Sequence, residues 1–300
     1  MLANLIDGKS IAADIRTEIK DKVAAIASNG GTVPGLAVIL VGARRDSQTY
    51  VNMKKKACAA AGIVSIGYDF EDNVTEKELL ATIQRLNVDS AIHGILVQLP
   101  LPAHLDQDKI LQAVDPAKDV DGLHPMNVAA LQLYSGNALE APFSIACTPL
   151  GCLVLLEKSG IDLKGKHCVV VGRSQLVGLP MARLLLGRDA TVTIAHSKTE
   201  DIQSLTRTAD VVVAAAGRAH LVEGNWIKPG AVVIDVGINS VDIVPEKEGG
   251  KTYKLVGDVD FDAAVEVCSQ ITPVPGGVGP MTIAMLLRNT LRSCERLKLS

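Results

Sequence analysis

The chain has 300 residues, 48% of them hydrophobic and 21% charged, with a formal net charge of −3 at pH 7. A chain of this length and apolar content can bury a large core, and its length favours two domains over one. The charge pattern excludes a nucleic-acid footprint, because lysine and arginine form no stripe interleaved with aromatic residues and Lys54–Lys56 is too short to make one.

The first half of the chain alternates predicted helices with predicted strands. Helical periodicity covers 11–27, and the apolar run at 36–41 ends in a glycine, which is typical of a buried parallel strand. We expect a helix over 47–61, capped by Ser47 and ended by Gly62. A strand, a helix and a strand are expected at 63–70, 75–86 and 92–97. This alternation predicts an α/β fold.

The second half repeats the alternation. Thr148 and Pro149 start a predicted helix through Leu156, with the threonine as cap and the proline in the first turn. Predicted strands follow near 168–171, 190–195, 211–215 and 231–236. An amphipathic helix is expected over 281–296. The fold class is therefore α/β throughout, and no internal repeat or low-complexity segment stands out.

A buried strand that runs into a glycine-lined turn and a helix stands out at 167–180. Gly172 and Gly178 would let the backbone approach phosphate oxygens, and the amides that open the helix near Leu179 would point a positive dipole end at them. This pattern is typical of a dinucleotide site, although Ser174 stands where the usual Gly-x-Gly-x-x-Gly motif has its second glycine. A simple tight turn is the alternative.

The cofactor type is indicated one strand further on. The next strand ends in His196-Ser197-Lys198, where an NAD-binding fold usually places an acid on the ribose hydroxyl. An acid would repel an added phosphate, whereas Arg173, Ser197 and Lys198 offer it charged and hydroxyl donors. The sequence therefore favours NADP, with ordinary solvated charges as the alternative.

Polar residues beside other predicted strands and helices are further candidates, because ligands of such folds lie at the carboxyl ends of the strands. Tyr50 and Lys54 are one helical turn apart, so that a ring could stack on a planar substrate while an amine moves a proton. Gln98 follows a strand as an amide for which a lysine head is a natural partner. A surface pair and an amide that satisfies loop backbone are the alternatives.

Two more segments are candidates for ligand binding, one through its acidic side chains and one through its rigid backbone. The acids of 118–122 could receive the N–H groups of a heterocycle, or form an ordinary Asx turn. The segment 272–282 sets three glycines between prolines before a helix, which makes a rigid surface for close approach of a bulky ligand, or a structural hinge.

The cysteines and the amino terminus indicate the compartment of the protein. The six cysteines lie scattered without disulfide or zinc spacing, so we expect reduced core thiols; they stand at positions 58, 147, 152, 168, 268 and 294. The amino terminus has no apolar signal core and carries Asp7 early, and no run approaches a membrane span. We expect a cytoplasmic protein, although a mature organellar form would look the same.

Taken together, these segments resemble the bifunctional methylenetetrahydrofolate dehydrogenase/methenyltetrahydrofolate cyclohydrolase family, nearly end to end. The motifs that carry the resemblance are Tyr50-Val-Asn-Met-Lys54-Lys-Lys-Ala, Gly94-Ile-Leu-Val-Gln98-Leu-Pro-Leu-Pro, Lys118-Asp-Val-Asp121-Gly, Cys147-Thr-Pro-Leu-Gly151, Val171-Gly-Arg-Ser174 and Pro273-Val-Pro-Gly-Gly-Val-Gly-Pro-Met-Thr282. Their joint occurrence in this order is highly specific.

The resemblance implies two α/β domains flanking a cleft. The first would be a folate-binding catalytic domain over 1–147, joined by the C-terminal helix 281–300, and the second a Rossmann-like NADP-binding domain over 148–280 with a mainly parallel sheet. It also implies a homodimer through the NADP domain, tetrahydrofolate derivatives as partners, and no metal. One site would oxidise methylenetetrahydrofolate with NADP and hydrolyse the methenyl product to formyltetrahydrofolate.

The resemblance also implies roles for residues at matching positions. Lys54 would be the general acid/base of the hydrolysis, with Gln98 tuning and positioning it. Tyr50 would stack on the aminobenzoyl ring, and Asp121 would bind the pterin. These four are the expected catalytic residues. The other implied contacts are Leu99, Pro275, Gly276 and Gly277 for folate, and Gly172, Arg173, Ser174, Ser197 and Ile238 for NADP.

Two positions depart from the family's pattern. Ala146 stands where a proline usually precedes Cys-Thr-Pro, and Ala129 ends a segment that is usually Asn-x-Gly. Both concern the pterin side of the site. Two alternative functions remain open at this point: a dehydrogenase without cyclohydrolase activity, against which Lys54 and Gln98 argue, and a non-catalytic NADP-binding regulator, which should have lost at least one of the four catalytic residues.

Overall fold

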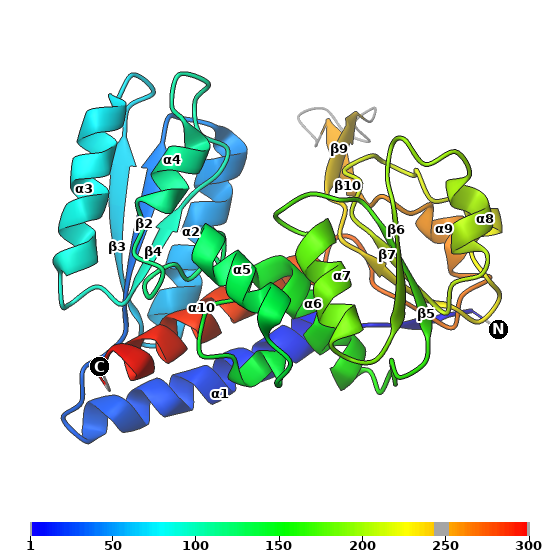
Figure 1. Ribbon diagram of the computed structural model, residues 1–300, viewed down its shortest axis with the longest axis horizontal. Coiled ribbons are helices and arrows are strands. Elements are labelled where there is room, and N and C mark those ends of the chain that lie inside the picture. Colours follow the sequence, from blue (N-terminus) through cyan, green and yellow to red (C-terminus); the bar gives the residue numbers. More distant parts are fainter. Residues whose placement is uncertain (1, 243–251, 299–300) are drawn as a thin grey trace. The chain divides into compact units, whose positions relative to one another are not determined.

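The computed structural model describes residues 2–242 and 252–298, and the chain divides into two compact units (Figure 1). The six-stranded unit comprises Met1–Ala12 and Thr148–Thr282, and the three-stranded unit comprises Ala13–Cys147 and Ile283–Ser300. Within the described residues, no helix combines the length and the apolar character needed to cross a membrane. The last two residues of the predicted C-terminal helix, 299 and 300, lie outside the described part.

The first residues of the chain are not where the sequence predicted them. Residues 1–12 belong to the six-stranded unit rather than to the domain expected over 1–147. The reason is a parallel pairing of β1 (Asn4–Leu5) with β11 (Gln270–Ile271), which attaches the start of the chain to the edge of the larger sheet.

The three-stranded unit is built on a parallel sheet in the order β3-β2-β4. The strands are β2 (Gly35–Val41), β3 (Val64–Phe70) and β4 (Gly94–Val97). Every residue of the central strand β2 is buried, which explains its unbroken apolar run. Leu79 and Ile83 of α3 (Glu76–Val88) pack in one cluster with Ile39 of β2, and Figure 1 shows the strands flanked by α2 (Arg45–Ala60) and α3.

The helix ends of this unit follow local chemistry. Thr75 caps α3 through a capping box, in which its hydroxyl accepts from the Glu78 amide at 3.3 Å and the Glu78 carboxylate accepts from the Thr75 amide at 3.0 Å. Gly62, with φ of +74°, follows α2 as predicted. The predicted Ser47 cap is wrong, because α2 already begins at Arg45 and Ser47 lies buried inside its first turn. The other elements of this unit are α4 (Gln107–Gln112), α5 (Pro125–Leu133) and η1 (Ala138–Glu140), together with α1 (Gly8–Ser28) from Ala13 on and α10 (Val278–Leu297) from Ile283 on.

The larger sheet has the order β1-β11-β8-β7-β5-β6, and all its pairings are parallel. The new strands are β5 (His167–Val171), β6 (Thr191–Ala195), β7 (Val211–Ala214) and β8 (Val232–Asp235). The predicted α/β class with a mainly parallel sheet is confirmed. The chain moves from β5 to β6 on one side and then returns to place β7 on the other side of β5. Parallel sheets bind ligands at the carboxyl ends of their strands beside such a switch point, here between β5 and β7.

Helices cover both faces of this sheet. Figure 1 shows α7 (Gly178–Leu186) on one side and α8 (Ile202–Thr206) and α9 (Phe261–Ala264) on the other. The other elements are α6 (Cys147–Lys158), η2 (Gly224–Trp226) and the antiparallel pair β9 (Asn239–Asp242) and β10 (Tyr253–Val256). The predicted Thr148 cap is wrong, because α6 begins one residue earlier; the Thr148 hydroxyl lies 3.1 Å from the Thr282 hydroxyl instead.

Candidate active site

Lys54 and Gln98 meet at the carboxyl edge of the three-stranded sheet. Lys54 projects from α2, and its Nζ donates a hydrogen bond to Gln98 Oε1 over 3.0 Å. Gln98 follows β4; its backbone N–H donates to the Ile39 carbonyl at 2.9 Å, and its Nε2 donates to the Leu99 carbonyl at 2.8 Å. Because the backbone and the side-chain nitrogen of Gln98 are both anchored, its Oε1 is held facing the lysine head.

Tyr50 lies one turn before Lys54 on α2 and remains 38% exposed. The pKa of its hydroxyl is raised, first by partial burial and then by the charge of Asp46. The phenol is therefore neutral at physiological pH, and the ring is an amphipathic surface beside the lysine.

The two acids of the 118–122 turn have different tasks. Asp119 is buried and closes the turn, since its carboxylate accepts from the amides of Gly122 at 3.0 Å and His124 at 2.8 Å. Asn127 Nδ2 donates to the same carboxylate at 2.8 Å. The Asx turn is thus made by Asp119, which leaves the half-buried Asp121 for other partners.

Asp121 lies beside the Lys54–Gln98 pair. Asp119 forms a parallel bridge with Ile95, so Asp121, two residues on, is level with the end of β4. Burial raises the pKa of Asp121, while the positive charge of Lys54 and a hydrogen bond from the Cys147 thiol act in the opposite direction. Burial also raises the pKa of Cys147 well above its usual value, so its thiol is a neutral donor.

Sequence reasoning missed Asn289, which connects the segments that carry Asp121 and Cys147. Asn289 of α10 is buried, and its Nδ2 donates to the carbonyls of Val120 at 2.8 Å and Ile145 at 2.9 Å. It thereby joins the segment before Asp121 to the segment before Cys147. The signal for it was a lone asparagine on the apolar face of an amphipathic helix, since such a buried amide must find partners.

Of the two departures from the family's pattern, Ala129 is an exposed residue of α5, whereas Ala146 packs directly on Gly122. A Cβ at Gly122, whose φ is +69°, would lie 2.4 Å from the Ala146 nitrogen. The backbone at 122 and 146 is therefore in direct contact, which leaves no room for a side chain on the turn.

The glycine loop lies in the six-stranded unit, at the switch point. Gly172 has φ of +137°, and a Cβ there would lie 2.2 Å from the Ala215 carbonyl oxygen. A Cβ at Gly178 would lie 2.3 Å from the Gly172 oxygen. The Ser174 hydroxyl accepts from the amides of Val177 at 3.2 Å and Gly178 at 3.4 Å, so it holds the turn where a second glycine is usual. The loop is a backbone cradle without space for side chains, which fits a dinucleotide pyrophosphate.

Arg173 and Ser197 follow the carboxyl ends of two neighbouring strands. Val171 of β5 pairs with Ala195 of β6, and each candidate stands two residues beyond its partner in that pair. Both side chains are exposed. Ile238, which follows β8, is 44% exposed. These residues line the carboxyl edge of one sheet.

The predicted folate loop also belongs to the six-stranded unit. The other expected folate contacts belong to the three-stranded unit; they are Tyr50, Lys54, Gln98, Leu99 and Asp121. The Gly277 amide donates to the Pro273 carbonyl at 2.8 Å, and a Cβ at Gly277 would lie 2.6 Å from Thr272 Cβ. Pro275, Gly276 and Gly277 thus form a tight turn, with φ of +119° at Gly276.

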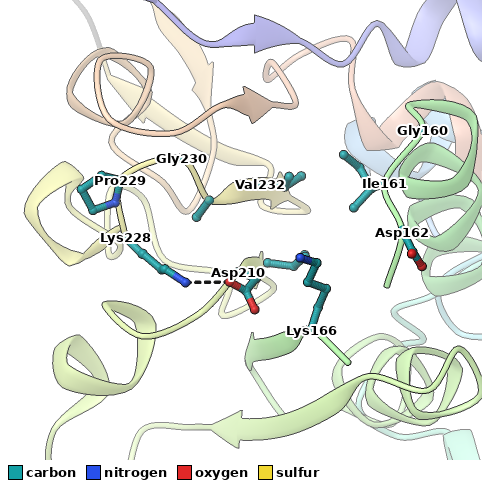
Figure 2. Close-up of a pocket in the computed structure, with 11 residues that line it drawn as sticks. Gly160, Ile161, Asp162, Lys166, Asp210, Lys228, Pro229, Gly230 and Val232 are labelled. Carbon is teal, nitrogen blue, oxygen red and sulfur yellow. Dashed lines mark hydrogen bonds and ion pairs between the residues drawn. The ribbon is translucent and has the colours of Figure 1, made fainter. Parts of the chain in front are cut away.

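A cavity of about 430 Å³ opens at the opposite edge of the six-stranded sheet (Figure 2). It is lined by the segments that precede β5, β7 and β8, including Lys166, Asp210 and Lys228. Lys228 pairs with Asp210 at 2.6 Å, and the other Asp210 oxygen accepts from the His167 amide at 2.9 Å. Because Lys228 and Asp210 pair with each other and the cavity lies at the amino ends of the strands, it is no candidate for the cofactor site.

Gly172→Ala is expected to lower the free energy of unfolding by about 2–4 kcal/mol, because the new methyl group meets the Ala215 carbonyl and the backbone conformation is strained. Urea unfolding measures the loss. Gly165→Ala is the matched control: Gly165 has φ of +71° with nothing within 4 Å of its added Cβ, so only the backbone cost of about 1 kcal/mol is expected. Equal losses in the two variants would contradict the close approach.

Comparison with known proteins finds matches over nearly the whole chain. The tetrahydrofolate dehydrogenase/cyclohydrolase catalytic domain matches residues 6–121, and the NAD(P)-binding domain of the same family matches residues 146–298. The chain is 53% identical over 294 residues to bifunctional protein FolD 2 of Arabidopsis thaliana, covering 98% of this chain and 96% of that protein.

Solved structures are similar over their full length. The bifunctional FolD methylenetetrahydrofolate dehydrogenase/cyclohydrolase of Campylobacter jejuni has a TM-score of 0.89 at 49% identity, covering 98% of this chain and 99% of that one. The Trypanosoma brucei methylenetetrahydrofolate dehydrogenase-cyclohydrolase, complexed with NADP and an inhibitor, has a TM-score of 0.93 at 44% identity, covering 100% of both chains.

Proposed function

The chain belongs to the tetrahydrofolate dehydrogenase/cyclohydrolase family, and we infer from this that it catalyses both reactions of a bifunctional enzyme. It oxidises methylenetetrahydrofolate to methenyltetrahydrofolate with NADP, and it hydrolyses the methenyl product to formyltetrahydrofolate. Relatives that are named bifunctional and match nearly the whole chain disfavour a single-activity dehydrogenase and a non-catalytic NADP-binding regulator.

The observation that carries the hydrolytic step is the hydrogen bond of 3.0 Å between Lys54 Nζ and Gln98 Oε1. Hydrolysis adds water to the methenyl carbon, removes a proton from that water and returns a proton to the ring nitrogen that leaves. We propose that the Lys54 amine performs these proton transfers and that Gln98 orients it. Asp121 is proposed to bind the pterin N–H groups, and the Tyr50 ring to stack on the aminobenzoyl group.

The dehydrogenase step requires positioning rather than acid/base chemistry, because a hydride leaves the one-carbon bridge directly. NADP, when bound, supplies the hydride acceptor. The backbone at Gly172 and Ser174 is proposed to hold the pyrophosphate, Arg173 and Ser197 the 2′-phosphate, and Ile238 the nicotinamide side. Leu99 and the turn Pro275, Gly276 and Gly277 are proposed folate contacts. The fit rests on the backbone cradle that a Cβ at Gly172 or Gly178 would fill.

A progress curve with methylenetetrahydrofolate and NADP tests this function when NADPH and the methenyl chromophore are followed separately. Growth of NADPH with little transient methenyl compound is the expected result. Growth of NADPH with persistent methenyl compound would mean a dehydrogenase alone, and absence of NADPH would contradict the proposal.

We also propose a homodimer formed through the six-stranded unit. Among the described strands, β6 forms one edge of the sheet, and an edge strand with apolar side chains is a template for pairing. Ile194 of β6 is 37% exposed, and Leu186 at the end of the neighbouring helix α7 is 52% exposed. These groups support a second copy as the partner.

Ile194→Lys is expected to convert the dimer into a monomer, because the lysine would bring a charge into an apolar contact between strands. Light scattering after size exclusion gives the mass. Ile66→Lys changes an exposed apolar residue on β3, an edge strand of the other unit, and should leave the dimer intact. A monomeric unmodified protein would contradict the proposal.

A cytoplasmic location is proposed as well. All six cysteines are free and buried, which suits a compartment that keeps thiols reduced. Fractionation of the source cells with organelle markers tests it, and recovery in an organelle fraction would contradict it.

A further inference from the structure

A buried carboxylate lies directly behind the carboxyl edge of the six-stranded sheet. Asp258 follows β10 and is 0% exposed. Its Oδ2 accepts from the amides of Ala216 at 2.6 Å and Gly217 at 2.8 Å, and its Oδ1 accepts from the Arg218 amide and from Asn239 Nδ2, both at 2.9 Å. Three successive amides converging on one anion form a nest, which here is filled by the protein's own side chain.

A second carboxylate holds Asp258 in place. Asp235, at the end of β8, accepts from the amides of Asp258 at 2.9 Å and Val259 at 3.0 Å. Burial raises the pKa of Asp235 to about 7, against the opposing effect of these amides. A Cβ at Gly257 would lie 1.7 Å from Asp235 Oδ2, and one at Gly237 would lie 2.2 Å from Asp258 Oδ1. Each carboxylate therefore packs directly against a glycine, where no side chain would fit.

The segments that Asp258 binds are those that follow β7 and β8. The segment after β7 touches the glycine loop after β5, since a Cβ at Gly172 would meet the Ala215 oxygen at 2.2 Å. These two segments flank the switch point between β5 and β7. Asn239, the other partner of Asp258, stands next to Ile238 in the segment after β8.

The direction of the bound dinucleotide follows from the proposed function, on which this inference rests. Arg173 and Ser197 assign the adenosine 2′-phosphate to the side of β6, and the loop after β5 takes the pyrophosphate. The nicotinamide half must then extend the other way, over the segments after β7 and β8. We propose that Asp258 is a positioning residue for hydride transfer, because its carboxylate fixes both segments that face the nicotinamide half.

The test uses the two reactions of the enzyme against each other, since only the dehydrogenase step requires NADP. Asp258→Asn keeps the size of the side chain, but either orientation of its amide turns an NH2 group toward two of the four donors. We expect kcat/KM for NADP to fall by about tenfold to a hundredfold. Hydrolysis of methenyltetrahydrofolate supplied directly should stay close to that of the unmodified enzyme.

The outcomes separate this inference from the proposed function. An unmodified enzyme without NADP-dependent oxidation would contradict the proposed function. With that activity present, an equal fall in both reactions of Asp258→Asn, or no fall in either, would overturn the positioning role. Asp260→Asn is the matched control: Asp260 caps α9 by accepting from the Ala263 amide, asparagine caps equally well, and both reactions should be unchanged.

Asn239→Ala decides the question if Asp258→Asn does not fold. It removes one of the four donors, keeps the carboxylate with its three backbone partners, and releases the segment that carries Ile238. The same selective effect on the dehydrogenase reaction is expected, at about threefold to tenfold, which is the value of one hydrogen bond. An equal change in the two reactions would overturn the inference.

Discussion

Lys54→Met is expected to lower cyclohydrolase turnover by about a hundredfold to ten-thousandfold, the range typical of a lost general acid/base. Methionine keeps the length and flexibility of the side chain but carries no transferable proton. Removal of the ammonium group also leaves Gln98 Oε1 without its donor at 3.0 Å. Folate binding should survive, because Tyr50 and Asp121 keep their positions.

Stopped-flow decay of methenyltetrahydrofolate measures the hydrolysis, and equilibrium titration with the same compound measures its binding. Lys55→Met is the matched control, since Lys55 is the next residue of α2 and its Nζ lies 3.7 Å from Asp69 rather than beside Gln98. It removes the same charge and should retain hydrolysis. Unchanged turnover in Lys54→Met would contradict the role of Lys54 as the general acid/base. An equal loss in both variants would indicate an effect of net charge rather than of proton transfer.

The longer elements of the fold could be predicted from local pattern. The helix at Glu76–Val88 repeats apolar residues at helical spacing, and the strand at Gly35–Val41 is a short apolar run that a glycine ends. By contrast, β1 and β11 have two residues each, too few for any pattern, and their pairing joins positions 4 and 270. That pairing moved the first residues of the chain from the predicted domain to the other one.

The candidate site was predictable in its residue types and less so in its contacts. Gln98 was placed at a strand end by pattern, but its contact with Lys54 depends on how β4 and α2 pack around β2. Two acids in one turn look alike in sequence, and the structure assigns the turn to Asp119 because its oxygens face the amides of Gly122 and His124. No local sequence pattern points to the role of Asp258, because its four hydrogen-bond donors come from segments distant in the sequence.

Arg173→Ala is expected to lower kcat/KM for NADP by about tenfold to a hundredfold, the value of a charge-assisted hydrogen bond to a phosphate. The same variant should leave kcat/KM for NAD almost unchanged, because NAD carries no 2′-phosphate. Ser197→Ala should act in the same direction with a smaller effect, since a hydroxyl is a neutral donor. Initial rates of NADPH and NADH formation, with methylenetetrahydrofolate saturating, measure the two preferences.

The physical basis of this prediction is the pairing of β5 with β6, which brings the residues that follow Val171 and Ala195 to the same edge. Arg207→Ala is the control for net charge, because Arg207 is exposed in the same unit and its guanidinium donates to the Asn225 carbonyl at 2.7 Å. It should change neither preference. If Arg173→Ala weakened NADP and NAD equally, the arginine would bind the pyrophosphate common to both, and the preference for NADP would have to come from Ser197 and Lys198.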